Sequence, residues 1–158
     1  MQRGFTLIEL VMILTLLAIL AAVAIPRFSG YGAIKQGNAV LKIASDIRYA
    51  QNRATTTQQR SRVSFTANGY TIVSCATSST CPCPGWDPPV KTIDLSTDYS
   101  GVTIASTVTN LEFDSLGRPY DGAGSCVNSI PATITVQYSG EANKTVTVQT
   151  QTGMVSYL

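Results

Sequence analysis

The chain has 158 residues, of which 44% are hydrophobic and 13% are charged, and its formal net charge is +2. It contains no histidine, which removes the commonest general base and the commonest neutral metal ligand. Because the sequence also lacks a G-x-S-x-G elbow and a phosphate-cradling loop, we predict that the protein is not an enzyme and holds no cofactor or metal.

The first long element is an almost wholly apolar run at residues 5–25, whose single charge is Glu9. As a helix with a rise of about 1.5 Å per residue, this run would be roughly 31 Å long, enough to cross a bilayer core of about 30 Å. A carboxylate near the centre of an inserting helix costs about 2.5–3.5 kcal/mol. Glu9 therefore requires a partner.

Two simpler interpretations of the run leave Glu9 unexplained. Arg3 before an apolar stretch is typical of a secretory signal, and Ala22-Val23-Ala24 has the A-x-A form cut by signal peptidase. The run is longer, however, than the apolar region of a signal peptide, which has about 7–15 residues. A plain single-pass anchor fits the length but gives the carboxylate no role.

After the apolar run, a helix-weakening residue is followed by a clear helical period. Pro26 lacks an N–H and its ring clashes with the preceding turn, so we predict a kink there. We expect residues 24–37 to be helical but able to stretch. Apolar residues then recur at three- and four-residue steps: Val40, Ile43, Ala44, Ile47, Ala50 and Ala54. This stripe should pack on the rest of the chain, and the helix should end near Gln58.

Charge is distributed unevenly along the chain. Residues 27–62 contain seven basic residues and one acidic residue, whereas residues 63–158 contain three basic and seven acidic residues. A basic stretch can bind phosphates of nucleic acid. Its place directly after the apolar run instead favours contact with lipid headgroups or shielding of the acidic part, and we predict no nucleic-acid partner.

The second half of the chain predicts a β-rich head at residues 59–158. Alternating apolar and polar residues, broken by Gly, Pro and Asn turns, indicate antiparallel strands. Strands are predicted at residues 63–65, 70–73, 90–95, 102–104, 111–113, 133–138, 145–149 and 154–158. The first two should form a hairpin around residues 67–69, and the strand at 111–113 should end in a turn at 114–117.

Four cysteines lie in this head, namely Cys75, Cys81, Cys83 and Cys126. An even number in an exported chain favours two disulfides in an oxidising compartment. A four-thiolate zinc site usually has paired C-x2-C knuckles, which the spacing C-x5-C-x-C does not match. The pairing stays open, and Cys81–Cys83 is the least favoured because so little chain separates them.

The residues around Glu9 carry a specific resemblance. Residues 4–9, GFTLIE, resemble the processing motif of type IV prepilins and pseudopilins, and Pro26 stands where such proteins often have a helix-bending proline. The resemblance implies a leader at residues 1–4, cleavage after Gly4, and N-methylation of Phe5. It also implies an α+β, type IV pilin-like fold, in which a long N-terminal helix over residues 5–58 packs on a C-terminal antiparallel β-sheet head.

The same resemblance implies where the protein acts and with what. A precursor would be held in the inner membrane, in contact with lipid, by residues 5–25, with its head in the periplasm. A prepilin peptidase would process it, and an inner-membrane assembly platform would add it to other pilin or pseudopilin subunits in a type IV pilus or a type II secretion pseudopilus. Breaking a buried ion pair costs about 3–5 kcal/mol. We therefore expect Glu9 to pair with the freed Phe5 ammonium, either that of a neighbouring subunit or its own.

The head is similar to the FimT/GspH domain of minor pilins and minor pseudopilins. The similar segments are residues 46–54, 111–119 and 153–155. This implies a minor subunit, and a principal pilin is the alternative. Some FimT-like pilins bind DNA through a basic motif near the C-terminus, but residues 153–158 contain no basic residue, which disfavours that role.

Calcium is a further possibility that the sequence disfavours. Some major pseudopilins bind calcium in a head loop, and residues 114–117 and 121–124 contain aspartates before glycines. No run matches a twelve-residue EF-hand loop, however, and aspartate before glycine is mostly a turn signal.

Overall fold

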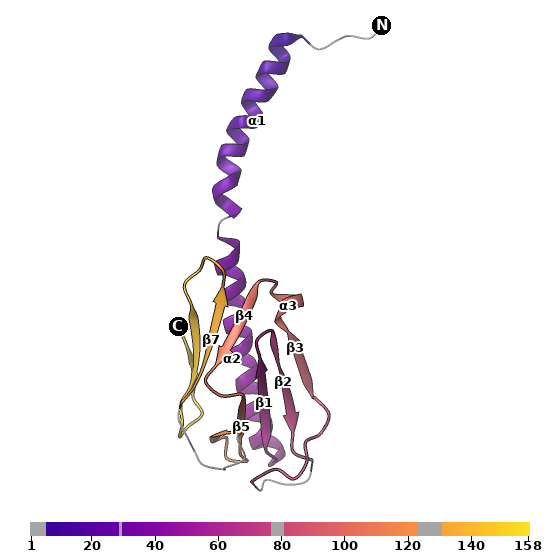
Figure 1. Ribbon diagram of the computed structural model, residues 1–158, viewed down its shortest axis with the longest axis vertical. Helices are drawn as coiled ribbons and strands as arrows, with labels where there is room; N and C mark the ends of the chain where they lie inside the picture. The colour runs from indigo at the N-terminus through magenta and orange to yellow at the C-terminus, as the bar shows by residue number, and fades with distance from the viewer. Residues whose placement is uncertain (1–5, 29, 77–80, 123–130) are drawn as a thin grey trace.

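Figure 1 shows the computed structural model of the chain, which describes residues 6–28, 30–76, 81–122 and 131–158. Helix α1 (Leu7–Phe28) projects away from a β-rich head, and helix α2 (Tyr31–Thr57) runs along that head. The predicted α+β class, with an N-terminal helix on an antiparallel β head, is confirmed.

The apolar stripe predicted for α2 is confirmed by burial. Each of its six predicted residues is at most 3% exposed, and Ala39 joins them. The helix ends at Thr57, and Gln58 adopts a left-handed conformation with φ of 57°, which stops the helical hydrogen bonding. The predicted end near Gln58 is therefore confirmed.

Two helices occupy the region in which the sequence predicted one continuous helix over residues 5–58. α1 ends at Phe28, and Gly30 is the residue before the first turn of α2. Glycine in a helix interior costs about 0.5–1 kcal/mol relative to alanine, which favours an interruption at this position. Pro26 lies within α1, two residues before its end.

Two antiparallel sheets form the head. The first has the strand order β3-β2-β1-β5-β6, and the second has the order β4-β7-β8-β9. In the first sheet the strands are β1 (Ser61–Thr66), β2 (Gly69–Ser74), β3 (Lys91–Asp94), β5 (Asn110–Phe113) and β6 (Pro119–Asp121). In the second they are β4 (Val102–Ser106), β7 (Ala132–Tyr138), β8 (Lys144–Val148) and β9 (Val155–Tyr157).

The hairpin predicted around residues 67–69 is confirmed, because β1 and β2 pair antiparallel from Thr66↔Gly69 to Ser61↔Ser74. The sequence did not predict two short elements, β6 and the one-turn helix α3 (Leu95–Asp98). β6 has three residues and begins with proline, so it carries no alternating signal. α3 begins where Asp94 caps the backbone N–H of Ser96, at the end of a predicted strand.

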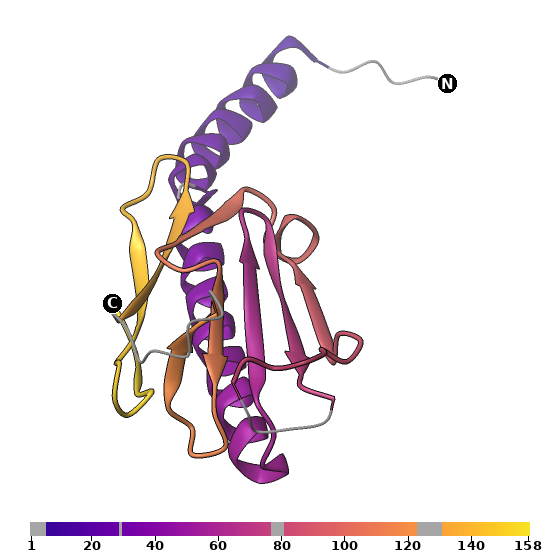
Figure 2. The ribbon, with the colours of Figure 1, turned by 60° about the horizontal axis from the view of Figure 1, so that its bottom comes forward.

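The core lies where both sheets pack on α2 (Figure 2). Alternate residues of β1, β2 and β5 face the helix from the first sheet, and alternate residues of β7 and β8 face it from the second. The buried set includes Val63, Ile72, Phe113, Ile134, Val136 and Val146. Because both sheets share this one helix, α2 fixes how they sit relative to each other.

A disulfide joins Cys75 and Cys83, whose Cα atoms lie 5.9 Å apart. The prediction of disulfides over a four-thiolate zinc site is therefore confirmed for this pair, because its two sulfurs are bonded to each other. None of the described cysteines is a free thiol, and Cys126 lies outside the described residues.

Candidate functional site

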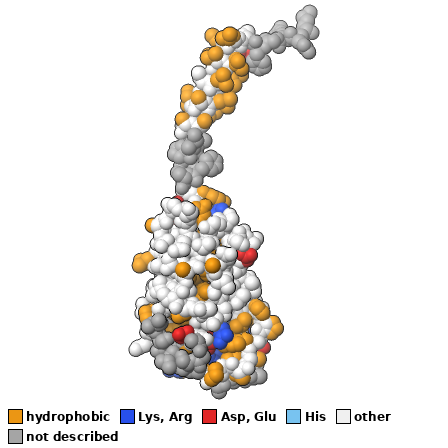
Figure 3. Space-filling model, in the orientation of Figure 1, with side chains coloured by type: hydrophobic (Ala, Val, Ile, Leu, Met, Phe, Trp, Pro, Cys, Tyr) orange, Lys and Arg blue, Asp and Glu red, His pale blue; other side chains and the backbone are white. Residues whose placement is uncertain are grey.

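The side chains of α1 are exposed at residues 7–22, and the large apolar residues there are uncovered (Figure 3). Exposed fractions range from 40% for Ile13 to 81% for Leu7. A helix that is apolar all round is normally buried in protein or in lipid. α1 therefore requires a covering that its own head does not supply.

Glu9 lies exposed in the first turn of α1. Its backbone N–H donates to the Thr6 hydroxyl at 3.4 Å, and no side chain in the described part of the chain pairs with its carboxylate. Gly4 and Phe5 lie outside the described residues. The geometry thus leaves the Glu9 carboxylate open to a partner.

Within the described residues, none of the helices combines the length and the apolar character needed to span a membrane.

Asp46, on α2, is the centre of a buried ionic cluster. Its carboxylate accepts from the Tyr70 hydroxyl at 2.8 Å and from Lys91 at 2.6 Å, and Lys42 lies 3.3 Å away. Burial, together with the bond to Asp46, raises the pKa of Tyr70, so the phenol stays protonated. The hydrogen bond to Asp46 raises the pKa of Lys91. The cluster ties α2 to β2 and β3.

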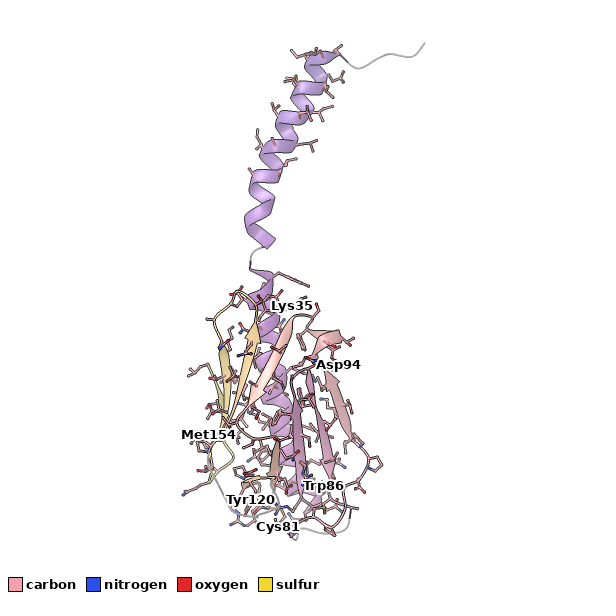
Figure 4. All side chains as sticks on the ribbon, viewed as in Figure 1. Lys35, Cys81, Trp86, Asp94, Tyr120 and Met154 are labelled. Carbon is pink, nitrogen blue, oxygen red and sulfur yellow. A yellow bond between two sulfur atoms is a disulfide. The ribbon has the colours of Figure 1, made fainter. Side chains whose placement is uncertain are left out.

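A second ionic cluster lies at the end of the head remote from α1. Glu112, which is 3% exposed, accepts from Arg60 at 3.0 Å through one oxygen and from Arg62 at 2.8 Å through the other. The Arg62 guanidinium stacks 4.0 Å from the Trp86 ring, and that of Arg60 lies 4.9 Å from the Tyr120 ring. Figure 4 labels Trp86 and Tyr120 at this end.

These contacts change the interpretation of the basic stretch at residues 27–62. Arg60 and Arg62 point into the head and pair with Glu112, and Lys42 pairs with Asp46. Three of the seven basic residues in the stretch are therefore engaged in ion pairs within the head. The sequence could not reveal this, because Glu112 is fifty residues away from its partners.

Asp114 closes the predicted turn after β5. One oxygen accepts from the backbone of Leu116 at 2.9 Å and of Arg118 at 2.8 Å. The other accepts from the Arg118 side chain at 2.8 Å and from Tyr120 at 3.2 Å. Burial alone would raise the pKa of Asp114, but the bonds from Arg118 and Leu116 hold it below its ordinary value. Asp114 is one of the aspartates that the sequence offered as calcium ligands. Both of its carboxylate oxygens accept hydrogen bonds within this turn.

The three segments that resemble the minor-pilin domain meet at one point. Gln51 of α2 donates to the carbonyl oxygen of Gly117 and to that of Thr152, at 2.8 and 3.1 Å. A Cβ on Gly153 would lie 2.4 Å from the Gln51 amide, and Gly117 has a φ of +77°. Glycines are needed at both turns for Gln51 to approach them.

Family models match nearly the whole chain. The model described as "Type II transport protein GspH" matches residues 39–153, and the model described as "Prokaryotic N-terminal methylation motif" matches residues 1–25. The latter range holds Gly4, Phe5 and Glu9.

Solved structures of similar fold include two minor subunits. The type IV minor pilin FimU of Pseudomonas aeruginosa aligns with a TM-score of 0.60 and 13% identity, over 80% of this chain and 90% of that chain. The minor pseudopilin EpsH from the Type 2 Secretion System of Vibrio cholerae aligns with a TM-score of 0.56 and 14% identity, over 78% of this chain and 96% of that chain. At such identities the likeness establishes the fold alone.

A curated relative matches over a shorter stretch. The type IV major fimbrial protein FimA of Dichelobacter nodosus is 42% identical over 50 residues, which are 32% of this chain and 32% of that protein. The chain therefore spans about a third of the length of the curated relatives it matches.

Proposed function

This chain belongs to the family of the type II transport protein GspH, and we propose that it serves as a minor, FimT/GspH-like subunit of a type IV pilus or type II secretion pseudopilus. It is a pilin or pseudopilin subunit, a structural protein and not an enzyme. One observation carries the proposal: the methylation motif at residues 1–25 and the GspH head at residues 39–153 stand on the same chain.

Processing comes first in the proposed sequence of events. A prepilin peptidase cleaves after Gly4 and the new N-terminal Phe5 is methylated, as residues 4–9 indicate. Before cleavage, residues 5–25 hold the precursor in the inner membrane, and the disulfide-bonded head stands in the oxidising periplasm. The exposed apolar side chains of α1 support contact with lipid at this stage.

Assembly then moves α1 from lipid into a bundle of equivalent helices. The inner-membrane platform and its ATPase drive this transfer. Leucine and lipid are nearly equivalent surroundings, so apolar contacts alone would allow helices to slide. Glu9 sets the register by pairing with the Phe5 ammonium of a neighbouring subunit, since an uncompensated buried charge costs about 3–5 kcal/mol. A contact with its own ammonium is the competing arrangement.

A principal filament pilin is the second candidate, and the match to the major fimbrial protein FimA favours it. The two roles differ in copy number. A principal subunit would dominate sheared filaments, whereas a minor subunit would be present at a small fraction of the main pilin.

The test is the composition of sheared surface filaments or of an isolated pseudopilus, measured by quantitative mass spectrometry. The proposal expects this protein at substoichiometric level, beginning at N-methylated Phe5. Its absence from every such filament, or a mature protein beginning at Met1 or beyond Ala24, would contradict the proposal.

A further inference from the structure

A groove of about 410 Å³ lies between the N-terminal half of α2 and the end of β9. Ile34 and Leu41 line it on the helix side, and Tyr157, Leu158 and Lys144 line it on the strand side. Ile34 is 60% exposed, Leu41 50% and Leu158 91%. Clustered apolar exposure of this kind marks an interaction surface.

We propose that this groove is the seat for helix α1 of an adjacent subunit, and that Lys144 faces the Glu9 carboxylate of the helix seated there. The inference rests on the proposed function, because it names the surface of the head that assembly uses. It goes beyond that function by assigning specific head residues to the contact.

The chemistry of the groove matches that of α1. Lys144 is the one charged side chain among the groove residues, and Glu9 is the one charged side chain between residues 5 and 25. Each surface is therefore apolar with a single charge, and the two charges have opposite sign. Such complementarity steers association and selects orientation more than it adds affinity. A carboxylate has two oxygens, so it can accept from Lys144 and from an ammonium at the same time.

The position of the groove also favours a helix from outside the subunit. The chain's own α1 extends away from the head and does not cover the groove (Figure 1). Gly37 forms part of the α2 wall, and a Cβ there would lie 3.4 Å from the Lys144 ammonium. That separation is an ordinary van der Waals contact, so the Lys144 ammonium lies directly beside the α2 wall of the groove.

The groove is concave, between a helix on one side and a strand on the other. A rod about 10 Å wide, such as a helix with its side chains, suits that shape better than a flat bilayer surface does. We therefore assign the groove to a subunit helix, and contact with lipid becomes a contrary outcome of the test.

The test uses photo-crosslinking in cells that assemble the filament. A photoreactive amino acid replaces Leu41 in the groove or, as a matched control, Leu116, which is 69% exposed on the turn between β5 and β6. In sheared filaments, position 41 should crosslink to α1 of another subunit, and position 116 should not. Lys144→Glu should lower the yield per incorporated subunit about fivefold, whereas Lys144→Arg should preserve it.

Incorporation into filaments is measured before the crosslinks are mapped. If the protein is incorporated but position 41 crosslinks to lipid, to a neighbouring head or to nothing, the groove assignment is wrong and the proposed function stands. The assignment is also wrong if Lys144→Glu, with its circular dichroism spectrum unchanged, gives the normal yield. If the protein never enters a filament, both the assignment and the proposed function fail.

Discussion

The side-chain amide of Gln51 donates to the carbonyl oxygen of Gly117 at 2.8 Å, and so joins the C-terminal part of α2 to the turn that follows β5. The same amide reaches Thr152 before β9. One side chain thereby connects three segments that lie up to a hundred residues apart. The relative position of the two sheets depends on this contact as well as on the apolar core.

Replacing Gln51 with leucine should destabilise the protein by about 1–3 kcal/mol, because the partly buried carbonyl of Gly117 and the exposed carbonyl of Thr152 both lose their donor. Asn52→Ala is the control, since Asn52 is exposed on the next position of the same helix. Urea unfolding of the full chain in detergent, followed by circular dichroism, measures both variants. Equal urea midpoints for Gln51→Leu and Asn52→Ala would show that the Gln51 hydrogen bonds contribute nothing to stability.

Replacing Glu9 with alanine should leave the precursor inserted and cleaved but poorly incorporated into filaments. The reason is the loss of the carboxylate that neutralises a buried ammonium, at a cost of about 3–5 kcal/mol. Mass spectrometry of the N-terminus checks cleavage, and immunoblotting of sheared filaments checks assembly. Thr15→Ala, on the same exposed helix, is the control. Normal assembly of the Glu9 variant would end the register hypothesis.

Asp114 should stabilise the fold at neutral pH and lose that contribution in acid. Its folded pKa lies below the ordinary value of 3.8, so ionised Asp114 favours the folded state above that value. The contribution disappears as the pH falls through the folded pKa. Asp114→Asn should therefore be less stable than the unchanged protein at pH near 7, and this deficit should shrink in acid.

Urea midpoints measured across that pH range check the prediction, with Asp98→Asn as the control because Asp98 is exposed in α3. A deficit for Asp114→Asn that stays constant with pH would mean that the carboxylate's charge is not the source of its effect.

Trp86 is the single tryptophan of the chain, so intrinsic fluorescence reports directly on the segment that follows the disulfide. Arg62→Ala should move its emission to longer wavelength, because the guanidinium that stacks 4.0 Å from the ring would be replaced by water. Arg118→Ala removes a guanidinium from the same end of the head without touching Trp86 and should leave the emission unchanged. Identical spectra for both variants would contradict the stacking.

The parts of the fold that were predictable are those with local signals. The apolar stripe from Val40 to Ala54 predicted α2 and its buried face. The alternation of apolar and polar residues predicted β7 and β8. The interruption at Gly30 was harder to predict, because the signals of Pro26 and three nearby glycines overlap. β6 and α3 are too short to carry a period, and they exist because neighbouring strands and a capping aspartate hold them.

The long-range contacts could not be predicted in the same way. The sequence singled out Glu9 because a charge in an apolar run is conspicuous by itself. Nothing local to Arg60 or Arg62 indicates that both turn inward toward Glu112, and nothing local to Gln51 indicates its two carbonyl partners. Pairing across fifty or more residues is decided by the register of the sheets.

The junction at Gly30 determines how this molecule responds to tension. Helix α1 ends at Phe28, the Gly30 carbonyl accepts from Ile34 as α2 begins, and the site of a Cβ on Gly30 has no atom within 4 Å. A pull between rod and head is therefore concentrated on a few uncrowded backbone torsions. The subunit should lengthen there first, before either helix unwinds and before the sheets come apart.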